Sequence, residues 1–321
     1  MRAIQVSEHG GPDVLVPAEL DDPVIGPDQL LVATDAAGVN YIDTYIRTGT
    51  YPQAVPYIPG SEGSGVVVEI GAHVRDFTVG DRVAWAAAPG SYAERVAVNA
   101  AAAIAVPDAV SAQVAASALL QGMTAHYLIE SVYKPEPGET VLIHAGAGGV
   151  GLLLTQLAAA RGVRVITTVS TDAKEELSRE AGADQVLRYG DDLALRVRDL
   201  TDGIGVAAVY DGVGAATFEA SLFSLRVRGM LALFGAASGQ VPPFDLQRLN
   251  PAGSLFVTRP TLAHYTRDRA ELTWRAGDVM NAIADGSLRL RVGGEYALAE
   301  AAQAHRDLQA RKTTGSIVLL P

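Results

Sequence analysis

The stretch Thr140–Gly151, TVLIHAGAGGVG, constrains the fold of this chain more than any other segment. An apolar run leads into three glycines spaced as Gly146-x-Gly148-x-x-Gly151, and the residues that follow, LLLTQLAAARG, have the spacing of a helix. In such a strand–turn–helix unit the first glycine permits a tight turn, the second lets the backbone approach a pyrophosphate, and the third lets the helix pack on the sheet. The amides at the helix N-terminus then face the phosphates. A structural glycine turn is the alternative, but the later βα units favour dinucleotide binding.

The rest of the chain divides into a β-rich first part and a region in which strands and helices alternate. Short apolar or alternating runs separated by Gly, Pro and Asp predict strands over the first hundred residues. From Thr140 to about Val257 strands alternate with helices, which predicts a parallel sheet covered by helices. A length of 321 residues suggests two domains. We therefore predict an α/β protein that combines a doubly wound parallel sheet of the Rossmann type with a second, β-rich domain.

The segment VRVITTVSTDAKEE, which begins at residue 163, bears on the choice between NAD and NADP. An NAD-preferring site usually offers Asp or Glu at the end of the second strand, hydrogen-bonded to the ribose 2′-OH. Here the strand ends in Ser170 and Lys174 follows, so a 2′-phosphate would meet hydroxyls and a cation. Asp172 is the complication, and with Glu175 it fits an Asp-x-x-Glu cap of the next helix. We expect NADPH as the cofactor, with Ser170 and Lys174 among its contacts.

The composition excludes several classes of protein. The chain has no cysteine, which removes disulfides, iron–sulfur clusters, thiolate catalysis and cysteine-ligated zinc. Its six histidines show no ligand spacing, so we expect no metal site. The net charge of −11 disfavours nucleic acid as a partner. No apolar run approaches the ~20 residues needed to span a bilayer, and the N-terminus lacks the apolar region of a signal peptide. We expect a soluble, cytoplasmic protein without a membrane partner.

The order of the parts resembles the medium-chain dehydrogenase/reductase superfamily over essentially the whole chain. Zinc alcohol dehydrogenases of that superfamily carry Cys and His where this sequence has Asn40 and Ser61, so the resemblance implies that the zinc site is absent. The sequence is more similar to the zinc-free quinone oxidoreductase branch, to which ζ-crystallin is related. Gly146 departs from the Ala or Ser common in that branch. The motifs that carry the resemblance are HGGPDVL (9–15), GVNYIDTYIRTGTYP (38–52), GDRVAW (80–85), HAGAGGVG (144–151), VYDGVG (209–214) and SLFVTRP (254–260).

The resemblance also implies how the chain is divided and where the cofactor binds. A GroES-like substrate domain would cover residues 1–121 and 263–321, with the NADPH-binding Rossmann domain, 122–262, inserted between them. The cofactor would lie in the cleft between these domains, a preferred place for ligands. A homodimer would form through sheet edges near residues 254–260. In addition to the contacts named above, the implied cofactor residues are Thr124, Gly149, Val150, Tyr189, Val213, Phe234, Gly235, Phe256, Val257, Arg259 and Arg311.

The segment AGVNYIDTYIRTGTYP, residues 37–52, holds the candidate catalytic residues in a chain that is only 6% aromatic. Reduction of an ordinary ketone builds an alkoxide, which needs a Lewis acid or a positioned proton donor. Reduction of a quinone builds a phenolate, and the conjugate phenol has a pKa of roughly 10, so this anion is less demanding. Tyrosine rings stack and their hydroxyls donate. We predict Tyr45 and Tyr51 as the substrate wall, with core packing as the alternative.

Asn40 corresponds to a residue near the nicotinamide in the family that the chain resembles, and an ordinary turn asparagine is the alternative. Three further polar residues are interpreted as structural. We expect Asp43 to partner Arg47 or backbone, and we expect neither Glu62 nor His144 to act in catalysis.

The predicted function is that of an NADPH:quinone reductase, in which hydride passes from the nicotinamide to a quinone. The closest alternative delivers the same hydride to an activated alkene, such as an enone or an enoyl thioester. A hypothesis from another class is a binding or structural role, because relatives of ζ-crystallin include lens proteins and reported RNA binders. The acidic net charge argues against RNA.

Overall fold

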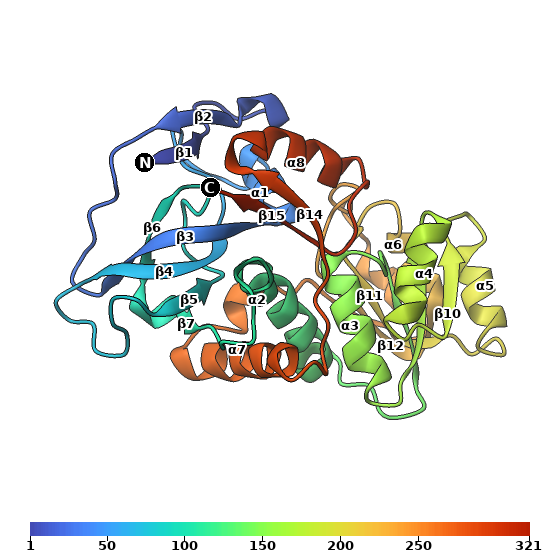
Figure 1. The fold of residues 1–321 in the computed structure, drawn as a ribbon. Coiled ribbons are helices and arrows are strands. Elements are labelled where there is room, and N and C mark those ends of the chain that lie inside the picture. Colours follow the sequence, from blue (N-terminus) through green and yellow to red (C-terminus); the bar gives the residue numbers. More distant parts are fainter. The chain divides into compact units, whose positions relative to one another are not determined.

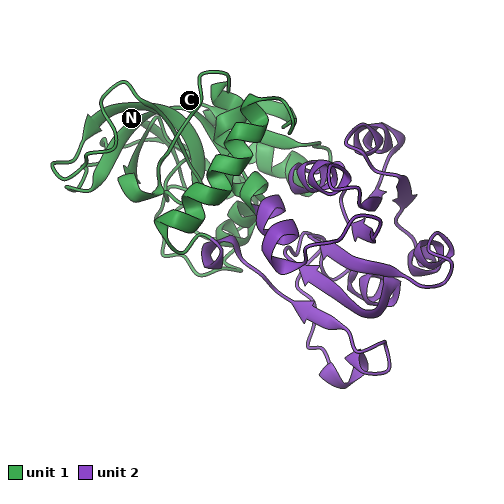
Figure 2. Cartoon of the chain, turned by 90° about the horizontal axis from the view of Figure 1, so that it is seen from below, with its two compact units in different colours: residues 1–123, 266–321 green, residues 124–265 purple.

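The computed structural model describes residues 1–321 and divides into two compact units, coloured green and purple in Figure 2. Unit 1 comprises Met1–Met123 and Thr266–Pro321, and unit 2 comprises Thr124–Tyr265. Helix α2 (Ala112–Tyr127) contains the first boundary. Ser111 lies just before this helix and caps it, since its Oγ accepts from the Val114 amide at 3.4 Å.

Unit 1 is built on a mostly antiparallel sheet of seven strands, with the order β14-β15-β3-β4-β5-β7 and with β6 paired to β3 (Figure 1). Strand β15 lies antiparallel to β3, with Ile317 opposite Val39, so the C-terminal residues complete the sheet formed by the first hundred. Strands β1 and β2 form a separate ribbon. The elements are β1 (Arg2–Gln5), β2 (Val16–Glu19), β3 (Gln29–Val39), α1 (Tyr41–Arg47), β4 (Glu62–Ile70), β5 (Arg82–Trp85), β6 (Arg95–Asn99), β7 (Ile104–Ala105), α7 (Arg269–Ala284), β14 (Val292–Ala297), α8 (Ala301–Gln309) and β15 (Ser316–Leu320).

Unit 2 is a six-stranded sheet with the order β10-β9-β8-β11-β12-β13, and every pair of neighbours is parallel. This is the doubly wound order, in which the chain reverses direction of winding between its first strand, β8, and its fourth, β11. The Rossmann part of the predicted fold is therefore confirmed. The elements are β8 (Thr140–Ile143), α3 (Gly149–Ala159), β9 (Arg164–Val169), α4 (Asp172–Glu180), β10 (Gln185–Arg188), α5 (Leu193–Asp199), β11 (Val206–Asp211), α6 (Phe218–Ser224), β12 (Leu225–Leu233) and β13 (Phe256–Thr258).

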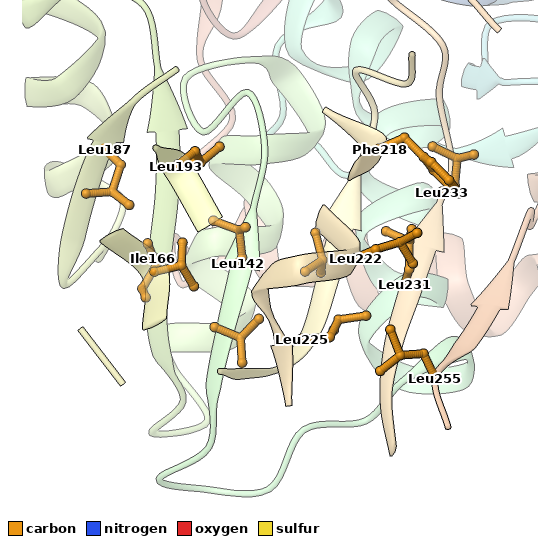
Figure 3. Close-up of a cluster of buried hydrophobic side chains, with 13 residues drawn as sticks. Leu142, Ile166, Leu187, Leu193, Phe218, Leu222, Leu225, Leu231, Leu233 and Leu255 are labelled. Atoms are coloured by element: carbon orange, nitrogen blue, oxygen red, sulfur yellow. The ribbon is translucent and has the colours of Figure 1, made fainter. Parts of the chain in front are cut away.

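A continuous apolar core holds the unit 2 sheet against its helices. All six residues of β11 are buried, as expected for a parallel strand covered on both faces. In Figure 3, Leu142 of β8 and Ile166 of β9 lie in the same cluster as Leu222 of α6 and Leu231 of β12. Each fully buried side chain of this kind contributes about 1.5–3 kcal/mol. The core fixes the carboxyl ends of the parallel strands, beyond which most of the candidate cofactor residues of unit 2 lie.

Candidate functional site

The glycine turn lies at the switch point of the unit 2 sheet. It joins the carboxyl end of β8 to the start of α3, and β8 is the strand beside which the winding reverses. Ligands of open α/β sheets bind at this position, outside the carboxyl ends of the strands. The sequence therefore places its phosphate-binding motif where the topology favours a ligand.

Close packing explains two of the three glycines. A Cβ on Gly146 would lie 2.6 Å from the Cβ of Thr167, and one on Gly151 would collide with the carbonyl oxygen of Ala145. Gly148 is the N-cap of α3 and provides no side-chain cap, so the first amides of the helix have no acceptor within it. Free amides at a helix N-terminus suit an anion, and the turn fits the pyrophosphate of a dinucleotide.

A buried chain of hydrogen bonds supports this turn from below. Ser221 Oγ donates to Asp211 Oδ2 at 2.7 Å, so it accepts from His144 Nε2 at 3.0 Å. The other ring nitrogen, Nδ1, then accepts from Thr168 Oγ1 at 2.9 Å, and Thr168 Oγ1 accepts from the Ala145 amide at 3.3 Å. Burial lowers the pKa of His144, which keeps the ring neutral.

His144 is thus structural, as expected, and it holds Ala145 in the left-handed conformation (φ 54°) that opens the turn. Asp211 and Ser221 were not predicted from the sequence. A signal existed for Asp211, because it is a lone carboxylate at the end of a wholly apolar strand.

The residues expected near a 2′-phosphate follow β9 and β10. Ser170 is exposed just beyond β9, Lys174 lies in the first turn of α4, and Tyr189 follows β10. The Tyr189 hydroxyl accepts from the Ala145 amide at 3.1 Å, and its ring stacks on His144 with 6.2 Å between centroids. Tyr189 therefore lies against the glycine turn.

The predicted cap of α4 is wrong by one residue. Thr171 is the N-cap, with its side chain accepting from the Lys174 amide, and Asp172 is the first helical residue. An extended Thr171 places its hydroxyl at the amides, which leaves the Asp172 carboxylate to bond Arg188 at 2.6 Å.

The other predicted cofactor residues lie in four places. Val213, Phe234 and Gly235 follow the carboxyl ends of β11 and β12, and Phe234 packs where Gly212 lacks a side chain. Thr124 is buried in α2. On the edge strand β13, Phe256 is 56% exposed and Val257 37%, with exposed Arg259 just beyond. Arg311 belongs to unit 1, where burial raises the pKa of Tyr41 and the charge of Arg311 opposes that rise. The cofactor role of each residue stays a prediction.

The predicted substrate-wall residues lie together in unit 1. The Tyr45 ring is 5.4 Å from that of Tyr51 and 5.6 Å from that of Tyr41, measured between centroids. Helix α1 places Tyr41 and Tyr45 four residues apart on one face, and the Tyr51 amide donates to the Tyr45 carbonyl at 3.1 Å. Three half-buried rings, with Tyr41 included, therefore form one aromatic cluster.

Asn40 is held by two buried polar side chains, one of which is itself held by a third. Its Nδ2 donates to Glu62 Oε2 at 2.6 Å, and its Oδ1 accepts from Gln121 Nε2 at 3.1 Å. Gln121 Oε1 accepts in turn from Ser316 Oγ at 2.7 Å, while Glu62 Oε1 accepts from the Leu120 amide at 2.7 Å. Burial raises the pKa of Glu62 to about 8, against the lowering effect of these hydrogen bonds. Asn40 is 4% exposed, and its orientation is set by its neighbours.

A second buried chain fixes the start of α1. Asp43 has one of its two expected partners, a backbone amide, that of Asn40. The other, direct pairing with Arg47, is not present, because two side chains stand between them. Arg47 donates to His305 Nδ1 at 3.0 Å, so His305 Nε2 donates to the Tyr92 hydroxyl at 3.1 Å, and that hydroxyl donates to Asp43 Oδ2 at 2.9 Å. The Asn40 amide donates to the same carboxylate oxygen at 2.8 Å. The C-terminal helix α8, through His305, thereby positions Asn40.

Two further findings concern metals and membranes. The structure contains no group of three or more His, Asp or Glu side chains arranged to hold a metal ion. None of its helices combines the length and the apolar character required to cross a bilayer.

Comparison with known proteins places the chain in a family. Residues 26–108 match the family described as alcohol dehydrogenase GroES-like domain, and residues 149–274 match the family described as zinc-binding dehydrogenase. A quinone oxidoreductase of Pseudomonas aeruginosa is 43% identical over 100% of this chain and 99% of that protein. A 2-haloacrylate reductase of a Burkholderia species is 41% identical over 99% and 98%. A mycobacterial protein solved in complex with NADPH is 56% identical over 100% of both chains, with a TM-score of 0.98.

A doubly wound nucleotide-binding sheet joined to a GroES-like domain defines a medium-chain dehydrogenase/reductase. Within that superfamily the chain belongs to the quinone oxidoreductase branch, as full-length identities of 40–43% to several quinone oxidoreductases show. It is an oxidoreductase by this membership.

Proposed function

We propose that this protein is an NADPH-dependent quinone reductase. The observation that carries the proposal is its 43% identity, over the full length of both chains, to a quinone oxidoreductase. The mycobacterial relative solved with NADPH supports the choice of cofactor. We further propose that unit 2 holds the cofactor and that unit 1 receives the acceptor, with domain limits near 1–121, 122–262 and 263–321.

In this proposal the residues of unit 2 bind and orient the cofactor. NADPH, when bound, supplies a hydride from its reduced nicotinamide. The amides of Gly149, Val150 and Gly151 would hold the pyrophosphate at the start of α3, because they have no acceptor in the helix. Ser170 and Lys174 would hold the 2′-phosphate beyond β9. The remaining predicted contacts orient the other parts of the cofactor.

The residues of unit 1 receive a flat, electron-poor acceptor. The cluster of Tyr41, Tyr45 and Tyr51 offers ring faces for stacking and hydroxyls for hydrogen bonds to the acceptor oxygen. Because the phenolate that forms is a weak base, hydrogen bonds from tyrosine hydroxyls are sufficient to stabilise it. Proximity of the acceptor to the cofactor supplies most of the acceleration. Buried hydrogen bonds with Glu62 and Gln121 keep the side-chain amide of Asn40 in one orientation. Asn40 directly precedes Tyr41, the first residue of this cluster.

Steady-state kinetics with NADPH and a series of benzoquinones test the proposal. We expect NADPH oxidation that depends on the quinone and that continues unchanged in the presence of a strong chelator. Absence of turnover with every quinone would reject the proposed acceptor, and loss of turnover in chelator would reject independence from metal.

A second candidate function is reduction of an activated alkene. The 2-haloacrylate reductase at 41% identity supports it, since that relative covers 99% of the chain. Both reactions deliver hydride to a conjugated electrophile. Parallel assays with quinones, enones and 2-haloacrylates, compared by kcat/KM, distinguish them, and turnover confined to alkenes would favour this second function.

We also propose a homodimer that forms through β13 and a cytoplasmic location. Strand β13 ends the unit 2 sheet, and Phe256 and Val257 on it are exposed, so a partner strand would cover an apolar edge. Light scattering of the wild type and of Phe256→Lys tests the dimer. A monomeric wild type would contradict it, and cell fractionation tests the location.

A further inference from the structure

Three charged residues surround the point where β9 ends. Arg188 is the last residue of β10 and lies in register with Val169, the last residue of β9. Its Nη2 is 2.6 Å from Asp172 Oδ1 and 2.7 Å from Glu175 Oε2. Both carboxylates belong to the first turn of α4. One guanidinium therefore bonds two acidic side chains beside the end of the second strand.

The position of these carboxylates matters for the choice of cofactor. A carboxylate near the end of the second strand normally accepts the ribose 2′-OH of NAD. A 2′-phosphate carries a charge of about −1.5 to −2 near neutral pH, and unpaired carboxylates would repel it. The Asp172 side chain is fully exposed and that of Glu175 is 28% exposed. Without Arg188, these carboxylates would oppose a 2′-phosphate beside Lys174 and shift the preference of the site towards NADH.

The ionic bonds keep the three groups charged and paired. The hydrogen bond to Asp172 raises the pKa of Arg188. Hydrogen bonds from Arg179 and Arg188 lower the pKa of Glu175. Arg179, one turn further along α4, bonds Glu175 with 2.8 Å between Nη2 and Oε1, whereas Asp172 bonds Arg188. Arg188 is thus the residue that pairs both carboxylates.

We propose that Arg188 determines the preference for NADPH by pairing Asp172 and Glu175, which would otherwise reject the 2′-phosphate. This inference rests on the proposed function, because it concerns the cofactor of that same site. Arg188 acts through the two carboxylates, so it is a positioning residue and not a direct ligand of the phosphate. Lys174 and Ser170 remain the proposed direct contacts.

Binding of two nucleotide fragments tests the inference without turnover. Adenosine 2′,5′-bisphosphate carries the 2′-phosphate and 5′-AMP lacks it, and calorimetry gives the Kd of each. We expect Arg188→Gln to weaken binding of the bisphosphate about tenfold, because the repulsion between an exposed carboxylate and the 2′-phosphate changes a binding constant by about this factor in water. Binding of AMP, which lacks the 2′-phosphate, should weaken less than twofold. The loss should shrink at high salt, where exposed charges are screened. An equal loss for both fragments, or no loss, would overturn the inference.

A triple variant separates pairing from direct contact. Asp172→Asn and Glu175→Gln combined with Arg188→Gln remove the carboxylates together with the cation, and we expect bisphosphate binding to return to within about twofold of the wild type. Failure to recover would mean that Arg188 contacts the phosphate itself and would overturn the pairing mechanism. Arg179→Gln is the matched control, because it removes one charge from α4 but leaves Asp172 paired, and it should change binding less than twofold.

Nucleotide binding by the wild type tests the proposed cofactor, and binding by Arg188→Gln tests the role of Arg188 separately. If the wild type binds no bisphosphate and no NADPH, the proposed cofactor is wrong. If the wild type binds both and Arg188→Gln does likewise, only the inference about Arg188 is wrong. Steady-state kinetics add a second readout, in which Arg188→Gln should raise the KM for NADPH and leave kcat unchanged.

Discussion

Replacement of Glu62 by glutamine should change how the stability of unit 1 depends on pH. Glu62 is fully buried, and burial raises the pKa of its carboxyl from 4.5 to about 8. Between these two values the folded chain holds a proton that the unfolded chain releases. The unfolded state binds fewer protons in that interval, so the free energy of unfolding falls as pH rises. A glutamine does not titrate, and the variant should lack this fall.

The size of the effect follows from the two pKa values. Each pH unit between them is worth about 1.4 kcal/mol, so the wild type should lose about 3–5 kcal/mol relative to Glu62→Gln between pH 5 and pH 9. The variant also has a constant cost. Both carboxyl oxygens of Glu62 accept hydrogen bonds, from Asn40 and from Leu120, and a glutamine offers only one acceptor. We expect this cost to be about 1–3 kcal/mol at every pH.

Tryptophan fluorescence during urea unfolding measures the difference. The two tryptophans, Trp85 and Trp274, both belong to unit 1, so the signal reports the unit that contains Glu62. Glu69→Gln is the matched control, since Glu69 is an exposed residue of the same strand, β4. Parallel curves of unfolding free energy against pH for the wild type and Glu62→Gln would refute the reasoning, because they would show that Glu62 does not hold its proton through this interval.

Three further predictions concern packing, a buried hydrogen bond and the aromatic cluster. Gly151→Ala should destabilise unit 2 by about 1–3 kcal/mol and weaken NADPH binding, because its Cβ would collide with the turn, whereas Gly277→Ala in α7 meets open space. Calorimetric melting and cofactor titration measure both, and equal behaviour of the two variants would contradict the packing argument. Tyr92→Phe removes a hydrogen bond to buried Asp43 and should cost about 1–3 kcal/mol in urea unfolding. An unchanged unfolding midpoint would show that the hydroxyl is dispensable. Tyr45→Leu should raise the KM for a benzoquinone about three- to tenfold and leave the KM for NADPH unaltered, because an aromatic pair contributes about 0.5–1.5 kcal/mol. An unaltered KM for the quinone would exclude Tyr45 from the substrate wall.

The sequence by itself determined the fold class and the nucleotide-binding turn. Both depend on local patterns, because apolar periodicity encodes which face of a strand or helix is buried, and glycine spacing encodes where the backbone must turn or pack closely. The doubly wound strand order follows from the strand–helix alternation together with the handedness of parallel crossovers. Tyr45 and Tyr51 could be singled out because they are close in sequence, although their roles stay predictions.

Only the tertiary structure decided how the polar side chains are paired. His305 and Tyr92 are separated by 213 residues, and no pattern in the sequence links them. Burial also decided the pKa of Glu62, which the sequence shows only as a carboxylate among glycines. Arg188 reads as an ordinary strand-end residue until β10 lies beside β9 and brings it to Asp172. Such pairings depend on which strands become neighbours and on how much water the packing removes, and both are properties of the folded chain.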